Sequence, residues 1–192
     1  CFAEPPPWPA AFATVEMGRV GAAGCEALCV RPRPPIEAVV QRLLLTPPGA
    51  EGGGGGNADA VFSYMAGRAA ELSEEQWARL SSTAFVPVHG ARDERTHAVP
   101  RSLFFGDARR RYGALLDYCC ESHSSAAGEF LLRCGVRKAP CARALADAVV
   151  RHHARAIEAA AGNVRAYLDV LRELCRGLRD SPALREELAN DG

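Results

Sequence analysis

Apolar residues recur at helical spacing in the first half of the chain. Between Pro35 and Pro47 they repeat at i, i+3, i+4, i+7 and i+8, which places them on one face of a helix over 36–44. A second apolar face runs over 58–72 and predicts another helix. The five consecutive glycines at 52–56 form a tether between the two helices, which lets them pack antiparallel.

A third, short helix is predicted after this pair. Ser73 and Gln76 have the spacing of a capping box, in which the serine accepts from a first-turn amide and the glutamine reaches back to the cap. We therefore expect residues 35–81 to form a helical hairpin with a Gly-rich tether plus a short helix. Residues 1–34 are rich in proline and predict an irregular segment.

The rest of the chain, residues 82–192, predicts a small hairpin followed by a helical domain. The β-branched and aromatic run at 84–88 indicates a strand that pairs with 97–100. Helical spacing then recurs in five segments, of which the second ends at Gly135, a natural left-handed cap. These segments are 102–118, 126–134, 140–152, 164–178 and 182–188.

The helix over 164–178 has the longest apolar stripe, and we expect its burial to anchor the C-terminal part. Asn163 is a suitable N-cap for it. Leu168 and Leu171 lie on the stripe, so replacing each with alanine should destabilise this part by roughly 2–5 kcal/mol. The stripe could instead form an intermolecular coiled coil, but a helix of this length favours packing within the chain.

Charge balance removes the electrostatic argument for several partners. The chain has 23 basic and 23 acidic side chains, so its net charge is zero. A protein that binds nucleic acid mainly through phosphate contacts is usually basic, and an anionic membrane surface also requires positive charge. No apolar run reaches the length of a membrane-spanning helix. We expect neither nucleic acid nor a membrane as a partner.

Eight cysteines raise the question of redox compartment. Disulfide-dense scaffolds are usually short secreted chains, whereas most of these cysteines fall inside helical patterns. We interpret them as reduced thiols of an intracellular protein, cytoplasmic or nuclear. The chain begins at Cys1 without a basic leader or an apolar run typical of a signal peptide, which indicates a fragment of a longer protein.

The order of several motifs resembles a known family. Leu80-Ser-Ser-Thr-Ala-Phe-Val-Pro-Val88 is followed by Val99-Pro-Arg-Ser-Leu-Phe-Phe105 and Phe104-Phe-Gly-Asp-Ala108, and the similarity continues to Tyr167-Leu-Asp-Val-Leu-Arg172. It covers roughly 72–175. This pattern is similar to the region downstream of the GHKL-type ATPase domain, of the histidine-kinase, heat-shock-chaperone and sacsin kind, in large eukaryotic proteins.

The resemblance implies that ATP and magnesium bind upstream and not in this chain. A GHKL nucleotide site has an acidic-to-Asn helix motif, an Asp-x-Gly-x-Gly segment and a Gly-rich lid, and none of these occurs here. The glycines at 52–56 lack the Lys and Ser/Thr of a phosphate loop. The implied role is a non-catalytic structural or interaction segment, in which the faces over 36–44 and 61–72 bind neighbouring domains or other proteins.

One cluster has the chemistry of a metal site. Thiolates and imidazoles are the ligands of tetrahedral zinc. The spacing matches no established zinc pattern, and small buried thiols often fill helix interfaces, so packing is the favoured interpretation. A Cys/His metal-binding module is the alternative function. Its candidate ligands are Cys119, Cys120, His123, Cys134 and Cys141.

Other candidate sites have weaker patterns. Ser122 or Ser124, His123 and Asp117 supply the groups of a hydrolytic triad, but sequence proximity does not define the required geometry. Cys25 with Cys29, the arginines at 109–111 and the histidines at 152–153 are each better explained as packing or solvated residues.

The predicted fold class is α+β, mainly α, with helical groups flanking a small β-hairpin. The predicted function is a non-catalytic segment of a larger GHKL-ATPase-containing, chaperone-like protein, with a metal-binding module or a stand-alone helical interaction domain as alternatives.

Overall fold

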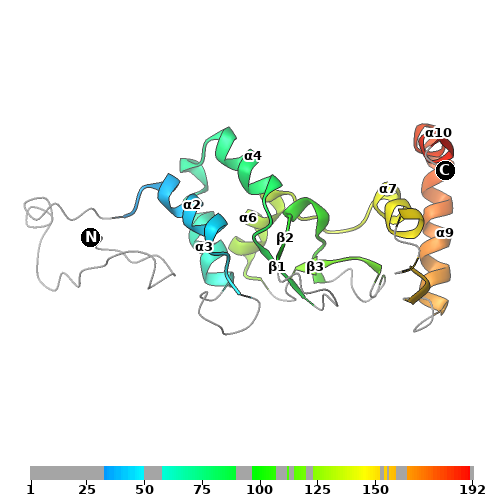
Figure 1. Ribbon diagram of the computed structural model, residues 1–192, viewed down its shortest axis with the longest axis horizontal. Coiled ribbons are helices and arrows are strands. Elements are labelled where there is room, and N and C mark those ends of the chain that lie inside the picture. Colours follow the sequence, from blue (N-terminus) through cyan, green and yellow to red (C-terminus); the bar gives the residue numbers. More distant parts are fainter. Residues whose placement is uncertain are drawn as a thin grey trace, which may run out of the picture. The chain divides into compact units, whose positions relative to one another are not determined.

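The chain is helical with a little β-structure, which confirms the expected mainly-α α+β class (Figure 1). The computed structural model describes residues 33–49, 58–89, 97–106, 112, 115–119, 123–151, 154, 156–158 and 164–190. Two compact units form. The first comprises residues 1–102 and 122–136, and the second comprises 103–121 and 137–192. Residues 82–102 and 122–136, which we assigned to the third segment, therefore pack with the first unit.

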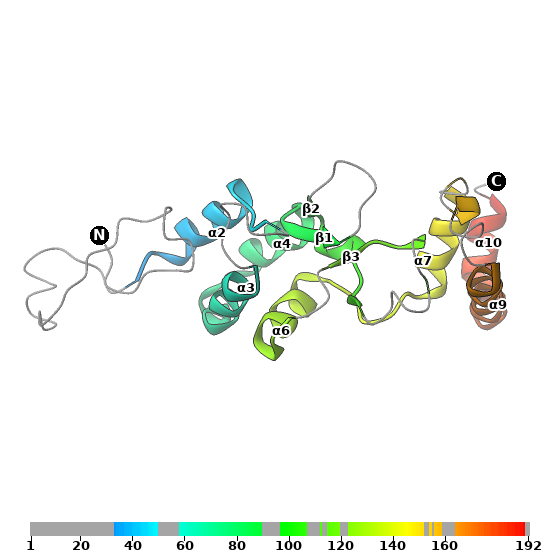
Figure 2. The ribbon, with the colours of Figure 1, turned by 90° about the horizontal axis from the view of Figure 1, so that it is seen from below.

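In the described part of the first unit, four helices bury apolar side chains. The helices are α2 (Ile36–Leu45), α3 (Ala58–Gly67), α4 (Glu74–Ser82) and α6 (Ser125–Cys134). Figure 2 shows α3 and α6 side by side. Val40, Phe62 and Leu131 are fully buried representatives of three of these helices. The faces of α2 and α3 that we expected to bind partners thus face the unit's own core, so that expectation is wrong.

Two local sequence signals end or begin helices as predicted. Ser73 Oγ accepts from Gln76 N at 3.2 Å, and Gln76 Oε1 accepts from Ser73 N at 2.9 Å, which completes the capping box of α4. Gly135 closes α6 with φ of 112°, a left-handed conformation that glycine adopts without steric penalty. The expected helix over 58–72 ends earlier, at Gly67, and a short 3-10 turn, η1 (Ala69–Glu71), follows.

The predicted hairpin is confirmed in the first unit. Strand β1 (Val86–His89) pairs antiparallel with β2 (His97–Ala98), with Val86 opposite Ala98 and Pro87 opposite His97. A 3-10 turn, η2 (Pro100–Ser102), follows β2 and packs against α4 and α6.

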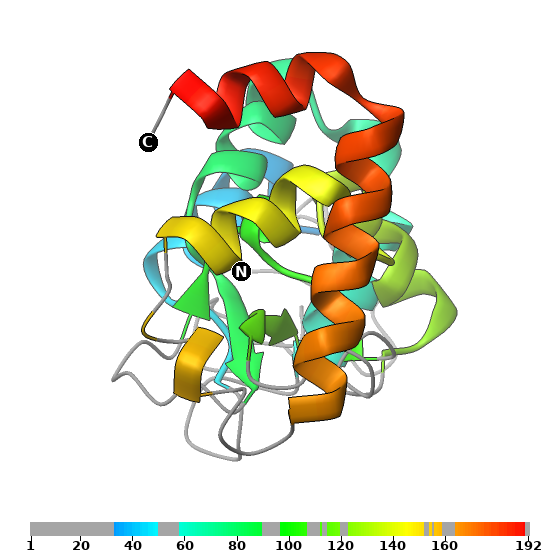
Figure 3. The same ribbon diagram turned by 90° about the vertical axis from the view of Figure 1, so that its right-hand side faces the viewer.

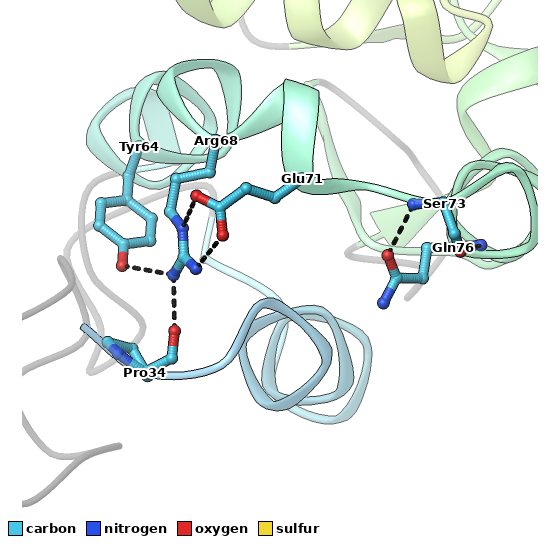
Figure 4. Close-up of polar contacts among 6 residues, drawn as sticks. All are labelled: Pro34, Tyr64, Arg68, Glu71, Ser73 and Gln76. Atoms are coloured by element: carbon cyan, nitrogen blue, oxygen red, sulfur yellow. Dashed lines mark hydrogen bonds and ion pairs between the residues drawn. The ribbon is translucent and has the colours of Figure 1, made fainter. Parts of the chain in front are cut away.

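A buried arginine joins the end of α3 to the start of α2 (Figure 4). The Arg68 side chain is 6% exposed. Its Nη1 donates to the Pro34 carbonyl at 2.8 Å and to the Tyr64 hydroxyl at 3.1 Å, while its Nε donates to a Glu71 carboxylate oxygen at 2.9 Å. The second oxygen of Glu71 accepts from Nη2, so the pair is bidentate. Hydrogen bonding to Arg68 lowers the pKa of Glu71 and hydrogen bonding to Glu71 raises that of Arg68.

The described part of the second unit includes three helices and a short strand with defined bounds. They are α7 (Ala142–Ala146), α9 (Val164–Asp180), α10 (Pro182–Asn190) and β3 (Tyr118–Cys119), with a single π-helical turn, η5 (Asp147–Arg151), after α7. In Figure 3, α9 is the long orange helix, with α7 beside it and α10 crossing its C-terminal end. Among the described residues, no helix has the length and apolarity needed to cross a membrane.

The prediction of a helix over 102–118 is wrong at both ends of that range. Phe104 is extended and forms parallel bridges with Tyr118 and Arg137. Its amide donates to the Asp117 carbonyl at 3.1 Å, and its carbonyl accepts from Cys119 N at 3.0 Å. Phe104, Tyr118, Leu145 and Leu174 belong to one buried core cluster, so this extended backbone is held by packing as well as by hydrogen bonds.

A close approach of two small residues joins α7 to α9. A Cβ atom placed on Gly177 would overlap the Cβ of Ala142, which is itself the first residue of α7. Neither atom belongs to a flexible side chain that could move aside. Glycine is therefore required at 177 by the packing of the two helices and not by its backbone conformation.

Replacing Gly177 with alanine should destabilise the second unit by about 1–3 kcal/mol, because the added methyl overpacks this contact. The free energy of unfolding from chemical denaturation measures the effect. Gly128→Ala is the matched control, since a Cβ at this glycine within α6 meets nothing within 4 Å. That variant should be stabilised by about 0.5–1 kcal/mol. Ala142→Gly should rescue Gly177→Ala, and a lack of rescue would contradict the proposed overlap.

Arg68→Ala should destabilise the first unit by about 1.5–3 kcal/mol, because it removes charge-assisted hydrogen bonds from a buried site. Arg68→Lys should recover only part of the loss, since an ammonium cannot reproduce the bidentate fork. The control is Arg79→Ala, which removes an exposed ion pair with Glu37 (2.8 Å) and should have a smaller effect in the same denaturation experiment. Equal losses in the two alanine variants would show that burial of Arg68 has no energetic consequence.

Candidate functional site

A polar cluster lies where the first turns of α3 and α6 meet. Asp59 and Ser63 are four residues apart, so they occupy one face of α3. Ser124 is the N-cap of α6, and its Oγ accepts from Ala127 N at 3.3 Å. The Asp59 Oδ1 accepts from the Ser124 amide at 2.7 Å, and the hydroxyls of Ser63 and Ser124 share a hydrogen bond of 2.8 Å.

His123 is buried beside this cluster. Its side chain is 5% exposed, and its Nδ1 lies 3.6 Å from Asp59 Oδ1. The Phe62 ring packs against it with centroids 5.9 Å apart. Within the described part of the chain, neither ring nitrogen has a hydrogen-bond partner.

Burial lowers the pKa of His123 below its usual value near 6.5, and the Asp59 carboxylate opposes that shift. The imidazole is therefore held neutral at neutral pH. A buried, neutral imidazole next to a carboxylate resembles one half of a catalytic dyad. The nearest hydroxyls do not complete it, because Ser63 and Ser124 bond to one another and to the α6 backbone.

The triad suggested by the sequence does not have the predicted members. Ser122 lies outside the described residues, and Asp117 belongs to the second unit, where its carbonyl accepts from Phe104. The carboxylate that faces His123 is Asp59, which lies in the first turn of α3. Asp59 and His123 are far apart in the sequence, so no local spacing connects them. The only local signal was the helical repeat that places Asp59 and Ser63 on one face.

Three of the candidate metal ligands, Cys119, Cys134 and Cys141, fall in different surroundings. Cys119 is buried in the second unit and its thiol donates to the Phe104 carbonyl at 3.5 Å. Cys134 is buried in the first unit, where desolvation raises its thiol pKa and keeps it protonated. Cys141 is exposed at the N-cap of α7, and Arg137 Nη1 lies 3.6 Å from its sulfur.

Among the residues that the structure describes, no three His, Cys, Asp or Glu side chains are grouped to hold a metal ion. Cys120 lies outside the described residues, as do Cys25, Cys29, the glycines at 52–56, the arginines at 109–111 and the histidines at 152–153. The metal-binding alternative therefore stays a prediction.

The apolar surface of the second unit differs from the sequence expectation. Val170 and Leu174 are the buried residues of α9, with Tyr167 and Leu178 packed partly against the core. Leu168, which we expected to be buried, is 44% exposed, and Val164 is 61% exposed. The core of the second unit therefore covers only part of the apolar face of α9. Asn163, the expected cap, lies outside the described residues.

The chain belongs to the family described as protein of unknown function (DUF3684), whose family model matches residues 11–190. No curated protein and no solved structure matches the chain.

The stability of the first unit should decrease as pH falls below about 6.5, because His123 has a lower pKa in the folded than in the unfolded chain. Above that pH the histidine is neutral in both states and its contribution is complete. Below it the unfolded chain binds the proton first, so the free energy of unfolding declines until the folded-state pKa is passed. Denaturation at a series of pH values measures this slope.

His123→Leu should flatten the slope, since the variant has no titrating group at this position. Asp59→Asn should steepen it, because the carboxylate that favours the protonated imidazole is removed while the side-chain oxygen can still accept from Ser124 N. A His123→Leu variant with the slope of the original chain would show that other groups cause the pH dependence.

Proposed function

We propose that this chain is a non-catalytic interaction segment of a larger protein that also contains a GHKL-type ATPase region. The observation that carries the interaction role is the distribution of exposed large apolar side chains. Four of the five in the described residues belong to the second unit; they are Val150, Ile157, Val164 and Leu168. Val164 and Leu168 lie one turn apart on α9, and adjacent exposed apolar residues are typical of a surface that is covered in a complex.

The first unit complements this role as a scaffold. Its apolar helix faces are buried, and Leu45 is its one exposed large apolar side chain among the described residues. The imidazole of His123 is buried beside Phe62 and Asp59, with 5% of its side chain exposed, so it is closed to a substrate. These features favour a structural function for the first unit and binding by the second.

The ATPase context rests on the motif order from Leu80 to Arg172 described above. In this arrangement, nucleotide binds upstream, and this chain transmits the resulting rearrangement to other parts of the protein or to partner proteins. The resemblance implies the upstream ATPase region, and the exposed apolar side chains are the proposed contact surface.

The test is to read the coding sequence upstream of Cys1 and to produce the longer protein. We expect an upstream region with the acidic-to-Asn, Asp-x-Gly-x-Gly and lid motifs. The longer protein should hydrolyse ATP, whereas the present chain alone should not. An initiator methionine immediately before Cys1 would contradict the proposal, as would ATP hydrolysis by the chain itself.

A further inference from the structure

Helix α9 has an apolar line that its own unit leaves uncovered. The buried face contains Val170 and Leu174. Beside it run Val164, Leu168, Leu171 and Cys175, at successive spacings of four, three and four residues. This is the spacing of a coiled-coil seam, and at 100° per residue it occupies an arc of about 60°. We call these four residues the α9 seam.

Three of the four seam residues are exposed. Val164 is 61% and Leu168 44% exposed, Cys175 is exposed, and Leu171 is partly buried. On one side the seam adjoins the unit's own core, through Tyr167 and Leu178. A partner must therefore approach from the other side.

That other side is an edge of arginines. Arg165, Arg172, Arg176 and Arg179 occupy the next arc of about 60° around the helix, and all four are exposed. Arg172 pairs with Asp169 at 2.7 Å. For the other three, no ion pair occurs within the part of the chain that the structure describes. A partner that covers the seam thus meets a row of positive charge.

The charge beside the α9 seam distinguishes among a second copy of the chain, a lipid surface and an amphipathic helix as its partner. A second copy paired antiparallel through the same seam would place its arginine edge against this one, which is repulsive. A lipid surface requires an apolar face of about 100° or more, and the acidic Asp169, Glu173 and Asp180 follow directly beyond the arginines. An amphipathic helix with a narrow apolar seam and acidic residues on one flank complements both features.

We propose that the α9 seam binds an amphipathic helix of another protein region, whose apolar residues pack on Val164, Leu168 and Leu171. Aspartate or glutamate residues on its flank pair with Arg165, Arg176 and Arg179. The proposal deepens and rests on the interaction role proposed above, for which it names the partner's chemistry. The apolar seam supplies contact area, and the arginine edge sets the orientation and the choice of partner.

Binding of designed peptides to the full chain tests the proposal. Three helical peptides share one leucine seam and have Glu, Gln or Lys at the flanking positions; each is used at concentrations where it is monomeric. Fluorescence anisotropy should show the Glu peptide binding at least about tenfold more tightly than the Lys peptide, with the Gln peptide between them. The affinity for the Glu peptide should fall as salt increases.

Matched variants locate the binding surface. Leu168→Ser should lower the affinity for the Glu peptide by at least about tenfold. Arg179→Glu should remove most of the preference for the Glu peptide over the Lys peptide. Leu45→Ser and Arg185→Glu are the controls, because they change exposed residues of the same kinds away from the seam. Both should bind like the original chain. All four positions are exposed, so folding should be retained, and circular dichroism checks it.

Several results would overturn the proposal. Equal affinities for the Glu and Lys peptides would do so, as would peptide binding that Leu168→Ser leaves unchanged. Self-association of the chain that Leu168→Ser abolishes would show that the seam binds a second copy. Seam-dependent binding to phosphatidylserine vesicles without peptide binding would show that it binds a lipid surface. Failure of the broader proposed function is distinguishable. A chain that binds the Glu peptide through the seam but has no ATPase region upstream would retain this inference and lose the ATPase context.

Discussion

The first unit depends on the burial of Phe62. Its ring lies 6.0 Å from that of Phe85, next to β1, and 6.0 Å from that of Phe130 in α6. The aromatic contact continues from Phe130 to Trp77 in α4, at 5.7 Å. One side chain of α3 thereby joins the hairpin and two other helices. It also packs on His123, so the same contact that builds the core removes water from the imidazole.

The parts of the fold that the sequence predicts are those controlled by neighbouring residues. The helical repeat over 36–44, the capping box of Ser73 and Gln76, and the glycine cap of α6 all act within a few positions of the chain. Each satisfies backbone groups at a helix end or places apolar residues on one face. The hairpin was also predictable, because a β-branched run is followed closely by its partner.

Contacts between distant residues were not predictable in this way. The apolar spacing around Phe104 fits a helix, but its backbone bonds to Asp117, Cys119 and Arg137 hold it extended. The pairing of Asp59 with His123 likewise arises only once α3 and α6 pack together. In both cases tertiary contacts override local preference, and no signal in either segment alone could reveal the partner.

The orientation of α9 also could not be predicted from the sequence. It decides which apolar residues of the helix are exposed. The sequence shows one wide apolar face, and it contains no information on which half is covered. The close approach of Gly177 to Ala142 settles this, because only the side of α9 bearing Gly177 can approach α7 so closely. That contact turns Val170 and Leu174 inward and leaves Val164 and Leu168 outward beside the arginine edge. Gly177 therefore determines which side chains of α9 are exposed to a partner.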